Sequence, residues 1–209
     1  MNYVYLHGFA SSPASSKATY FRHRFADRGL ELAIPALDGG DFERLTISGQ
    51  LKMIAETAGP GDVTLIGSSL GGYVAALYAA RHPEVKAVVL MAPAFCFPRR
   101  WEAELGAEDF AAWRRTGKRT IFHYGDGRER EIGFGLIEDG LHYEDYPVPQ
   151  CAALVLHGVN DTVVPVEYSR EFACRQGEGA RLVEYPSDHT LGDVTPAIWA
   201  ETERFLFQK

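Results

Sequence analysis

A serine lies at the centre of a short glycine-rich turn, Gly67-Ser68-Ser69-Leu70-Gly71-Gly72. An apolar run precedes the turn and an alanine-rich segment follows it, so the pattern predicts a strand, a sharp turn and a helix. In the pattern G-x-S-x-G the serine occupies a strained turn, and glycines avoid collisions with the neighbouring backbone. Ser69 is therefore the candidate nucleophile, and the start of a helix favours negative charge that develops beside it.

Short Gly/Ser turns are common, so this turn alone identifies no active site. An aspartate and a histidine follow two later apolar segments: Asp161 comes after Ala152–Leu156, and His189 comes after Arg181–Tyr185. The chain order Ser, Asp, His is the order found in α/β-hydrolases. A single loop aspartate is usually a turn former or a helix cap. The prediction of a catalytic triad therefore rests on the three residues together.

A further loop is suited to stabilise negative charge. The first apolar segment, Tyr3–Leu6, is followed by His7-Gly8-Phe9. We expect the backbone N–H groups of Phe9 and Leu70 to form an oxyanion hole, because Leu70 directly follows the nucleophile and Phe9 lies in the loop that supplies the second donor. His7 and His157 each precede a glycine at a strand end, where we expect structural hydrogen bonds.

No metal or cofactor site is predicted. The remaining histidines are expected on the surface or in a lid: His23, His82, His123 and His142. None of them forms a pair with the spacing of zinc ligands. Asp188 is expected to shape the loop before His189 rather than to compete as the acid. The glycines Gly39-Gly40 and Gly125-Asp126-Gly127 do not match a phosphate-binding loop.

The elements that must position these residues alternate along most of the chain. The predicted strands are Tyr3–Leu6, Glu31–Ile34, Val63–Ile66, Lys86–Met91, Ala152–Leu156 and Arg181–Tyr185. The predicted helices are Ser16–Arg28, Thr46–Ala58, Leu70–Arg81, Val166–Arg175 and Pro196–Phe207. This alternation predicts an α/β fold with a mostly parallel six-stranded sheet and helices on both faces. Reactive residues gather at the carboxyl ends of such strands.

Residues 95–150 interrupt the alternation with turn clusters, charges of both signs and scattered aromatic residues. We expect a single domain over residues 1–209, with 95–150 as a cap or lid insertion. The aromatic residues suit an apolar acyl pocket or, equally, the core of a small subdomain. The basic residues Arg114, Arg115, Lys118 and Arg119 suit a phosphorylated leaving group such as coenzyme A, although a solvated helix face is the favoured interpretation.

The composition limits the classes of partner. An apolar content of 46% in 209 residues is enough for a buried core, and the net charge of −7 argues against nucleic acid or an anionic membrane. No apolar run is long enough to predict a membrane span. The three widely spaced cysteines fit reduced thiols. The N-terminus has no signal-peptide pattern, so we expect a cytoplasmic location.

Several motifs together resemble the YqiA-type branch of the α/β-hydrolase superfamily. They are Tyr5-Leu6-His7-Gly8-Phe9-Ala10-Ser11-Ser12-Pro13, Ser16-Lys17-Ala18, Leu37-Asp38-Gly39-Gly40-Asp41-Phe42 and the turn around Ser69. Members of that branch are small bacterial serine esterases. The resemblance is specific over residues 3–92 and 151–193 and weak over 95–150. It implies the fold and the triad roles, but it does not extend to substrate preference.

The predicted reaction is hydrolysis of small-molecule carboxylic esters with short to medium acyl chains. Ser69 attacks the carbonyl carbon, His189 takes its proton, and Asp161 orients the imidazole. Because the base must be neutral, activity is expected to rise with pH across the histidine range. The alternatives are a thioesterase or amide hydrolase with the same triad, and a non-catalytic binding module of the same fold. The physiological substrate and the oligomeric state stay open at this point.

Overall fold

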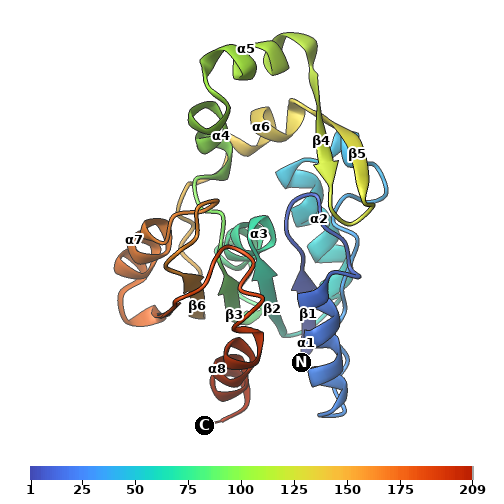
Figure 1. Cartoon of the computed structure of the whole chain (residues 1–209). Helices are drawn as coiled ribbons and strands as arrows, with labels where there is room; N and C mark the ends of the chain where they lie inside the picture. Colours follow the sequence, from blue (N-terminus) through green and yellow to red (C-terminus); the bar gives the residue numbers. More distant parts are fainter. Residues whose placement is uncertain (209) are drawn as a thin grey trace.

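A five-stranded parallel sheet forms the centre of the computed structural model, which describes residues 1–208. Its strands are β1 (Asn2–Leu6), β2 (Val63–Ser68), β3 (Val85–Met91), β6 (Ala152–Gly158) and β7 (Ala180–Tyr185). They lie in the order β1-β2-β3-β6-β7, and each neighbouring pair is parallel. The predicted α/β class is confirmed (Figure 1).

The predicted strand Glu31–Ile34 is wrong, and the sheet has five strands instead of six. Only Ala33 pairs with β1: its N–H donates to the carbonyl of Tyr3 at 2.9 Å, and its carbonyl accepts from the N–H of Tyr5 at 2.8 Å. The next N–H of a parallel ladder would belong to residue 35, and Pro35 has none. The segment therefore meets the edge of β1 through a single bridge.

Five helices flank the sheet: α1 (Ser16–Ala26), α2 (Ile47–Ala58), α3 (Leu70–Ala79), α7 (Glu167–Gln176) and α8 (Thr195–Phe207). Two short 3-10 helices are also present: Phe42–Arg44 precedes α2, and Gly177–Gly179 lies between α7 and β7. All five predicted helices are confirmed, with small shifts at their ends. The side chain of Thr46 accepts a hydrogen bond from the N–H of Gly49, so Thr46 caps α2.

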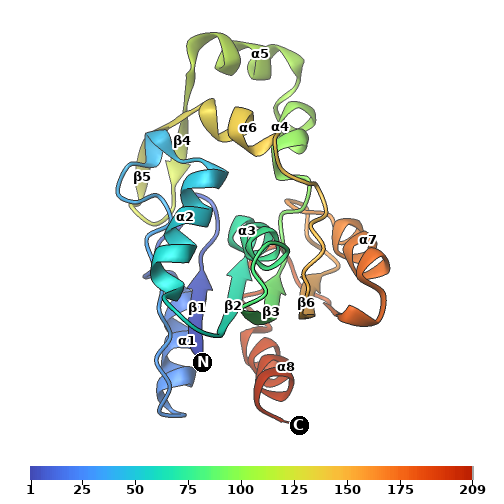
Figure 2. The ribbon, with the colours of Figure 1, turned by 180° about the vertical axis from the view of Figure 1, so that it is seen from behind.

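The sheet separates two apolar cores, because successive strand residues point to opposite faces. In β3, Val88 and Leu90 pack in the core that contains α2, α3 and α7. Val89 and Met91 of the same strand pack in the core that contains α1 and α8. Figure 2 shows α2 and α3 on the first of these faces. Burial on both faces explains why the central strands are continuously apolar.

Residues 95–150, called the cap region below, lie beyond the carboxyl ends of the parallel strands (Figure 1). They form α4 (Phe97–Leu105), α5 (Ala107–Thr116), α6 (Gly135–Gly140) and an antiparallel hairpin of β4 (Lys118–His123) and β5 (Arg128–Gly133). Trp113 and Phe134 are buried there, with ring centroids 5.3 Å apart. Trp101 packs on Trp113 at 5.2 Å. These rings build a core, which is one of the two expectations for the aromatic residues.

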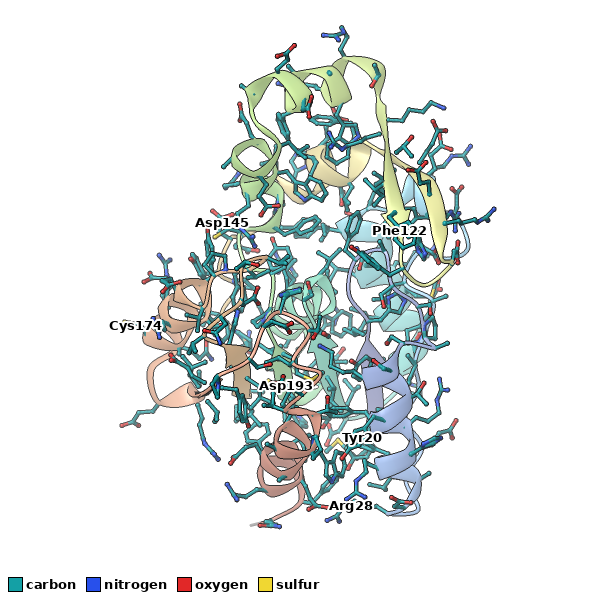
Figure 3. All side chains as sticks on the ribbon, in the orientation of Figure 1. Tyr20, Arg28, Phe122, Asp145, Cys174 and Asp193 are labelled. Atoms are coloured by element: carbon teal, nitrogen blue, oxygen red, sulfur yellow. The ribbon has the colours of Figure 1, made fainter. Side chains whose placement is uncertain are left out.

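Charged side chains of the cap region and one of the three thiols lie on the outside. Lys118 and Arg119 belong to β4, where they pair with the exposed carboxylates of Glu131 and Asp109. The three cysteines are free thiols, and Cys174 lies on the outer side of α7 (Figure 3). Within residues 1–208, no helix combines the length and the apolarity that crossing a membrane requires.

Candidate active site

Ser69 lies between the end of β2 and the start of α3, with φ 55° and ψ −120°. A positive φ is unusual for a residue with a side chain. The surrounding backbone leaves no room for a Cβ at two nearby positions: one built at Gly67 would lie 2.3 Å from the carbonyl oxygen of Gly71, and one built at Gly71 would lie 2.2 Å from that of Leu6. Close packing of strand, turn and helix therefore holds Ser69 in its strained conformation.

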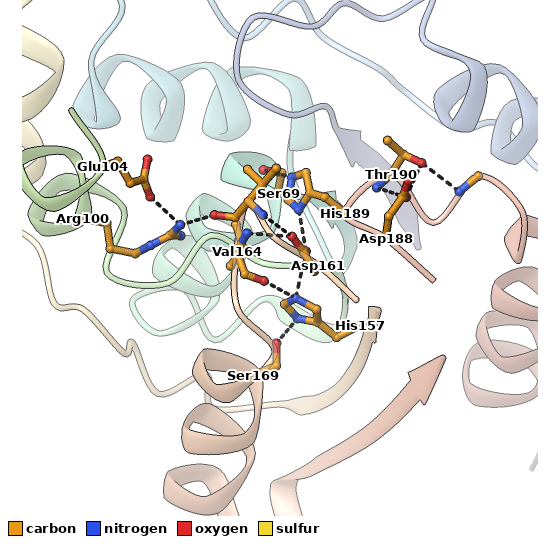
Figure 4. A network of polar contacts seen from close by, with 12 residues as sticks. Ser69, Arg100, Glu104, His157, Asp161, Val164, Ser169, Asp188, His189 and Thr190 are labelled. Carbon is orange, nitrogen blue, oxygen red and sulfur yellow. Dashed lines mark hydrogen bonds and ion pairs between the residues drawn. The ribbon is translucent and has the colours of Figure 1, made fainter. Parts of the chain in front are cut away.

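Two side chains from other loops complete a hydrogen-bonded chain at Ser69. His189, in the loop after β7, has its Nε2 atom 3.0 Å from the Oγ of Ser69 and its Nδ1 atom 2.6 Å from the Oδ2 of Asp161 (Figure 4). An ionised carboxylate only accepts hydrogen bonds, so Nδ1–H donates to Asp161 and Nε2 accepts from the hydroxyl of Ser69. The structure thus brings together the three side chains that the sequence predicts as a triad.

Asp161 is held by groups that favour its charged form. Its Oδ1 atom accepts from the N–H groups of Val163 at 2.8 Å and Val164 at 2.7 Å. Burial raises the pKa of this carboxyl, but hydrogen bonds from His157, His189 and Val164 outweigh burial and hold the pKa below its usual range. Asp161 is therefore ionised at neutral pH and keeps the imidazole of His189 in one tautomer.

A second histidine supports Asp161 from behind. The Nε2 atom of His157 lies 3.1 Å from the Oδ2 of Asp161 and 2.8 Å from the carbonyl oxygen of Val164. Both are acceptors, so Nε2 carries the hydrogen; Nδ1 accepts from the hydroxyl of Ser169 at 2.6 Å. The expected structural hydrogen bonding of His157 is confirmed. Its contact with Asp161 was not predicted from the sequence. A signal for this contact exists, because His157 and Asp161 lie at opposite ends of one short turn.

The loop after β1 passes directly beside the serine. A Cβ at Gly8 would lie 3.3 Å from the Cβ of Ser69. The Nε2 atom of His7 accepts from the N–H of Leu37 at 3.3 Å, so its Nδ1–H donates to the carbonyl of Gly8 at 3.0 Å. Burial lowers the pKa of His7, which keeps this ring neutral.

The hydrogen bond from His7 to the carbonyl of Gly8 orients the first predicted oxyanion donor, the N–H of Phe9. In a trans peptide the N–H points away from the carbonyl, so the bond from His7 to Gly8 fixes the direction of the Phe9 N–H. The second predicted donor, the N–H of Leu70, is the first in α3 and has no partner inside the helix. Both groups lie on segments that contact Ser69.

A cavity of about 540 Å³ opens beside this arrangement. Ser69, His189 and Phe9 form part of its wall, and Lys17 and Tyr124 form another part. Lys17 and Tyr124 were not predicted as site residues. For Lys17 a signal existed, because it stands at the start of the helix that follows the loop beside Ser69. For Tyr124, in the turn between β4 and β5, the sequence offers none.

The other predicted polar residues lie where expected, with one refinement. Asp188 is exposed and accepts from both the N–H and the hydroxyl of Thr190, so it shapes the loop. His123 lies in the cap region, but it is buried against Phe42, with ring centroids 4.6 Å apart. Its ring is part of the packing between the cap region and the loop before α2.

The parallel sheet, the strained serine turn and the loops around it define an α/β-hydrolase fold, and solved structures match it over nearly the whole chain. Alpha/beta hydrolase domain-containing protein 10 from mouse is 21% identical, with a TM-score of 0.79 over 98% of this chain and 89% of that one. A putative hydrolase from Agrobacterium vitis S4 is 22% identical, with a TM-score of 0.84 over 98% and 87%. Est1E from Butyrivibrio proteoclasticus is 20% identical, with a TM-score of 0.71 over 95% and 85%.

The chain belongs to the family described as "Uncharacterised protein family (UPF0227)", whose model matches residues 2–205. This match confirms the resemblance to the YqiA-type branch. The sequence matches none of the curated proteins. Identities near one fifth establish the fold, so the reaction has to be argued from the residues of this chain.

Proposed function

We propose that the protein is a serine hydrolase that cleaves carboxylic esters of short to medium acyl chains through an acyl-Ser69 intermediate. The observation that carries this proposal is the unbroken hydrogen-bond chain from the Oγ of Ser69 through His189 to Asp161. Ser69 lies on a strained turn at a helix N-terminus, and Ser69 and His189 line a cavity. Nucleophilic acyl transfer requires this arrangement.

In the first half of the reaction, the Oγ of Ser69 attacks the ester carbonyl carbon while the Nε2 of His189 takes the hydroxyl proton. Asp161 stabilises the imidazolium that forms, since its carboxylate already accepts from Nδ1. The N–H groups of Phe9 and Leu70 receive the oxyanion of the tetrahedral intermediate. The imidazolium then protonates the leaving alcohol, and the acyl group stays on Ser69.

In the second half, water replaces the alcohol. Neutral His189 takes a proton from water as it attacks the acyl-Ser69 carbonyl, and it returns that proton to Oγ when the carboxylic acid leaves. The same oxyanion donors serve both steps. The whole reaction consumes one water molecule and returns Ser69 and His189 to their starting states.

We further propose that residues 1–209 act as one domain in which the cap region selects the acyl group. The ring of Phe9 packs on Phe97 and Trp101 of α4, with centroids 5.9 and 5.7 Å apart. Tyr124, from the turn between β4 and β5, lines the cavity and is 77% exposed. The cap region therefore touches the proposed oxyanion loop on one side and borders the cavity on another.

The test is steady-state hydrolysis of p-nitrophenyl esters of increasing chain length, together with matched thioester and anilide substrates. The wild type is expected to cleave esters fastest, and Ser69→Ala is expected to lose about 10⁶ in kcat. Ser48→Ala is the control, because neither Ser48 nor Asp139, to which its hydroxyl donates, lines the cavity. A preference for the thioester or anilide would change the substrate class, whereas an inactive folded wild type would favour the binding-module alternative.

A further inference from the structure

Lys17 is a charged residue that lines the cavity but takes no part in the proposed reaction. It is the second residue of α1 and lines the cavity that Ser69 and His189 also line. The following residues Ala18 and Phe21 are buried in the core beneath α1. Lys17 itself is half-buried and lines the cavity.

The ammonium of Lys17 has no partner among residues 1–208: the structure gives it neither a hydrogen-bond acceptor nor an ion pair, and only longer-range attraction to Asp188 and Asp161 acts on it. By contrast, Arg28, just beyond the C-terminal end of this helix, binds Glu203 at 2.8 Å. A half-buried cation that lines a cavity and has no protein partner is suited to receive an anion there.

Burial sets the charge of this ammonium. It lowers the pKa of Lys17 to about 8, while the carboxylates of Asp188 and Asp161 act in the opposite direction. Lys17 is therefore mostly a cation at neutral pH, and a bound anion would strengthen that state.

The groups next to Lys17 are hydrogen-bond donors. The serines that line the cavity at this end are Ser11, Ser15 and Ser16. Ser15 stands at the N-cap position of α1, yet its side chain makes no capping hydrogen bond, so its hydroxyl is available to a ligand. The first N–H groups of α1 also lack partners inside the helix, and the helix dipole adds positive potential there.

We propose that the cavity binds an acyl substrate that carries an anionic oxygen group, a carboxylate or a phosphate, held by the ammonium of Lys17 and the hydroxyls of Ser15 and Ser16 while Ser69 attacks the ester carbonyl. This inference rests on the proposed function and deepens it by naming a substrate class. Lys17 would thus determine specificity and would take no part in proton transfer.

The experiment compares p-nitrophenyl hydrogen glutarate, adipate and pimelate with their neutral methyl-capped counterparts. Acetate esters of 2-hydroxyethyl phosphate and of glycol form a second pair, which tests a phosphate on the alcohol side. For the wild type, kcat/KM is expected to favour the anionic member of at least one pair by about tenfold. In Lys17→Met that ratio should fall to about one, mainly through KM, because the contact binds ground state and transition state alike.

Two variants control for the charge and the helix. Lys17→Arg keeps the charge and should retain part of the preference. Arg22→Met removes an exposed charge from the same helix and should leave the preference unchanged. If Lys17→Met lowers both members of a pair equally, Lys17 merely holds the loop of Asp188 and His189, and the proposal is overturned. A wild type that favours the neutral members overturns it as well.

Binding of free glutarate and of inorganic phosphate to Ser69→Ala, measured by calorimetry, separates this inference from the proposed function. Binding that Lys17→Met weakens about tenfold supports the anion site even if no ester is turned over. No binding of either anion to a folded protein that cleaves neutral esters overturns the anion site and leaves the esterase proposal standing. Should Lys17→Met fail to fold, Lys17→Gln, which also removes the charge, takes its place in the same comparison.

Discussion

The loops at the carboxyl edge of the sheet and the cap region above them use polar and apolar side chains in opposite ways. At the sheet edge, the buried side chains of Asp161 and His157 bond to each other and to neighbouring groups. In the cap region, ion pairs such as Lys118 with Glu131 are exposed, and aromatic rings such as Trp113 fill the interior. The first region is built around hydrogen bonds of fixed direction, and the second is built around packing.

This difference explains which region constrains the chemistry. Backbone contacts leave little freedom at the sheet edge, where a Cβ at Gly71 would meet the carbonyls of Leu6 and His7 within 2.5 Å. Packing of aromatic rings tolerates changes of size and orientation better than a directed hydrogen-bond chain does. We therefore expect changes at the sheet edge to reduce turnover and changes in the cap region to alter substrate range or stability.

The largest effect after loss of the nucleophile is expected for Asp161→Asn. Oδ1 accepts from two backbone N–H groups, so the amide oxygen would take that position and the NH₂ group would face Nδ1 of His189. His189 would then adopt the wrong tautomer, and kcat should fall by about 10⁴. Asp188→Asn is the matched control and should cost less than about tenfold, since the Asp188 side chain bonds to Thr190 and makes no hydrogen bond to Ser69, Asp161 or His189. Equal losses in the two variants would mean that the acid is misassigned.

A pair of glycine substitutions compares the two regions directly. Gly71→Ala places a methyl group against the carbonyl of Leu6 and should displace the loop of Phe9, with a loss of about 10²–10³ in kcat and about 3 kcal/mol in the free energy of unfolding. Gly135→Ala, in α6 of the cap region, meets no atom within 4 Å and should stabilise the protein by about 0.5–1 kcal/mol. Urea denaturation and ester hydrolysis measure both, and an active Gly71→Ala variant would contradict the account.

The pH dependence of the preference for anionic esters tests the role of Lys17, which lines the cavity between the sheet edge and the cap region. The pKa of Lys17 is lowered to about 8, below its ordinary value, so the ammonium is charged below that pH and neutral above it. The ratio of kcat/KM for an anionic ester to that for its neutral counterpart should therefore be full near pH 6, fall through pH 8 and level off in more alkaline solution. The requirement for a neutral base is the same for both esters, so it cancels in this ratio. Lys17→Met should give a ratio that does not change with pH.

The smallest effect on turnover is expected for Trp113→Ala in the cap region. Loss of this buried ring should cost about 3–5 kcal/mol in the free energy of unfolding. Trp113 reaches Phe9 only through Trp101, so hydrolysis of a short ester should fall by less than about tenfold. Phe21→Ala, in α1, is the control for a buried ring outside the cap region. A loss of turnover above about a hundredfold in Trp113→Ala alone would show that the cap core holds the oxyanion loop.

Much of the sheet and of the candidate site could be predicted because both follow from local patterns. Continuous apolar strands give the parallel sheet, and the positions of Asp161 and His189 just after strands bring them to the same edge as Ser69. The segment Glu31–Ile34 has a strand-like sequence, but one proline decides its pairing. Pro35 lacks the N–H that the next hydrogen bond to β1 would need. Whether residue 35 must supply that N–H depends on the register with β1, which the sequence of the segment alone does not specify.

What could not be predicted depends on contacts between distant residues. The bond from His157 to Asp161 depends on the direction of a buried ring, and the position of Lys17 in the cavity depends on how α1 packs on the sheet. The cap helices are short and owe their stability to tertiary packing around Trp113 and Phe134 rather than to periodicity. In the cap region, the glycines of Gly125-Asp126-Gly127 are a local signal of a turn, the one between β4 and β5.

The central claim is that the Oγ of Ser69 is the nucleophile. The most direct measurement is reaction of the folded protein with a fluorophosphonate, followed by intact-mass and peptide mass spectrometry. The account predicts one adduct per chain, located on Ser69, and its absence in both Ser69→Ala and His189→Ala. An adduct on another residue, or an unmodified wild type whose fold is intact, would contradict it.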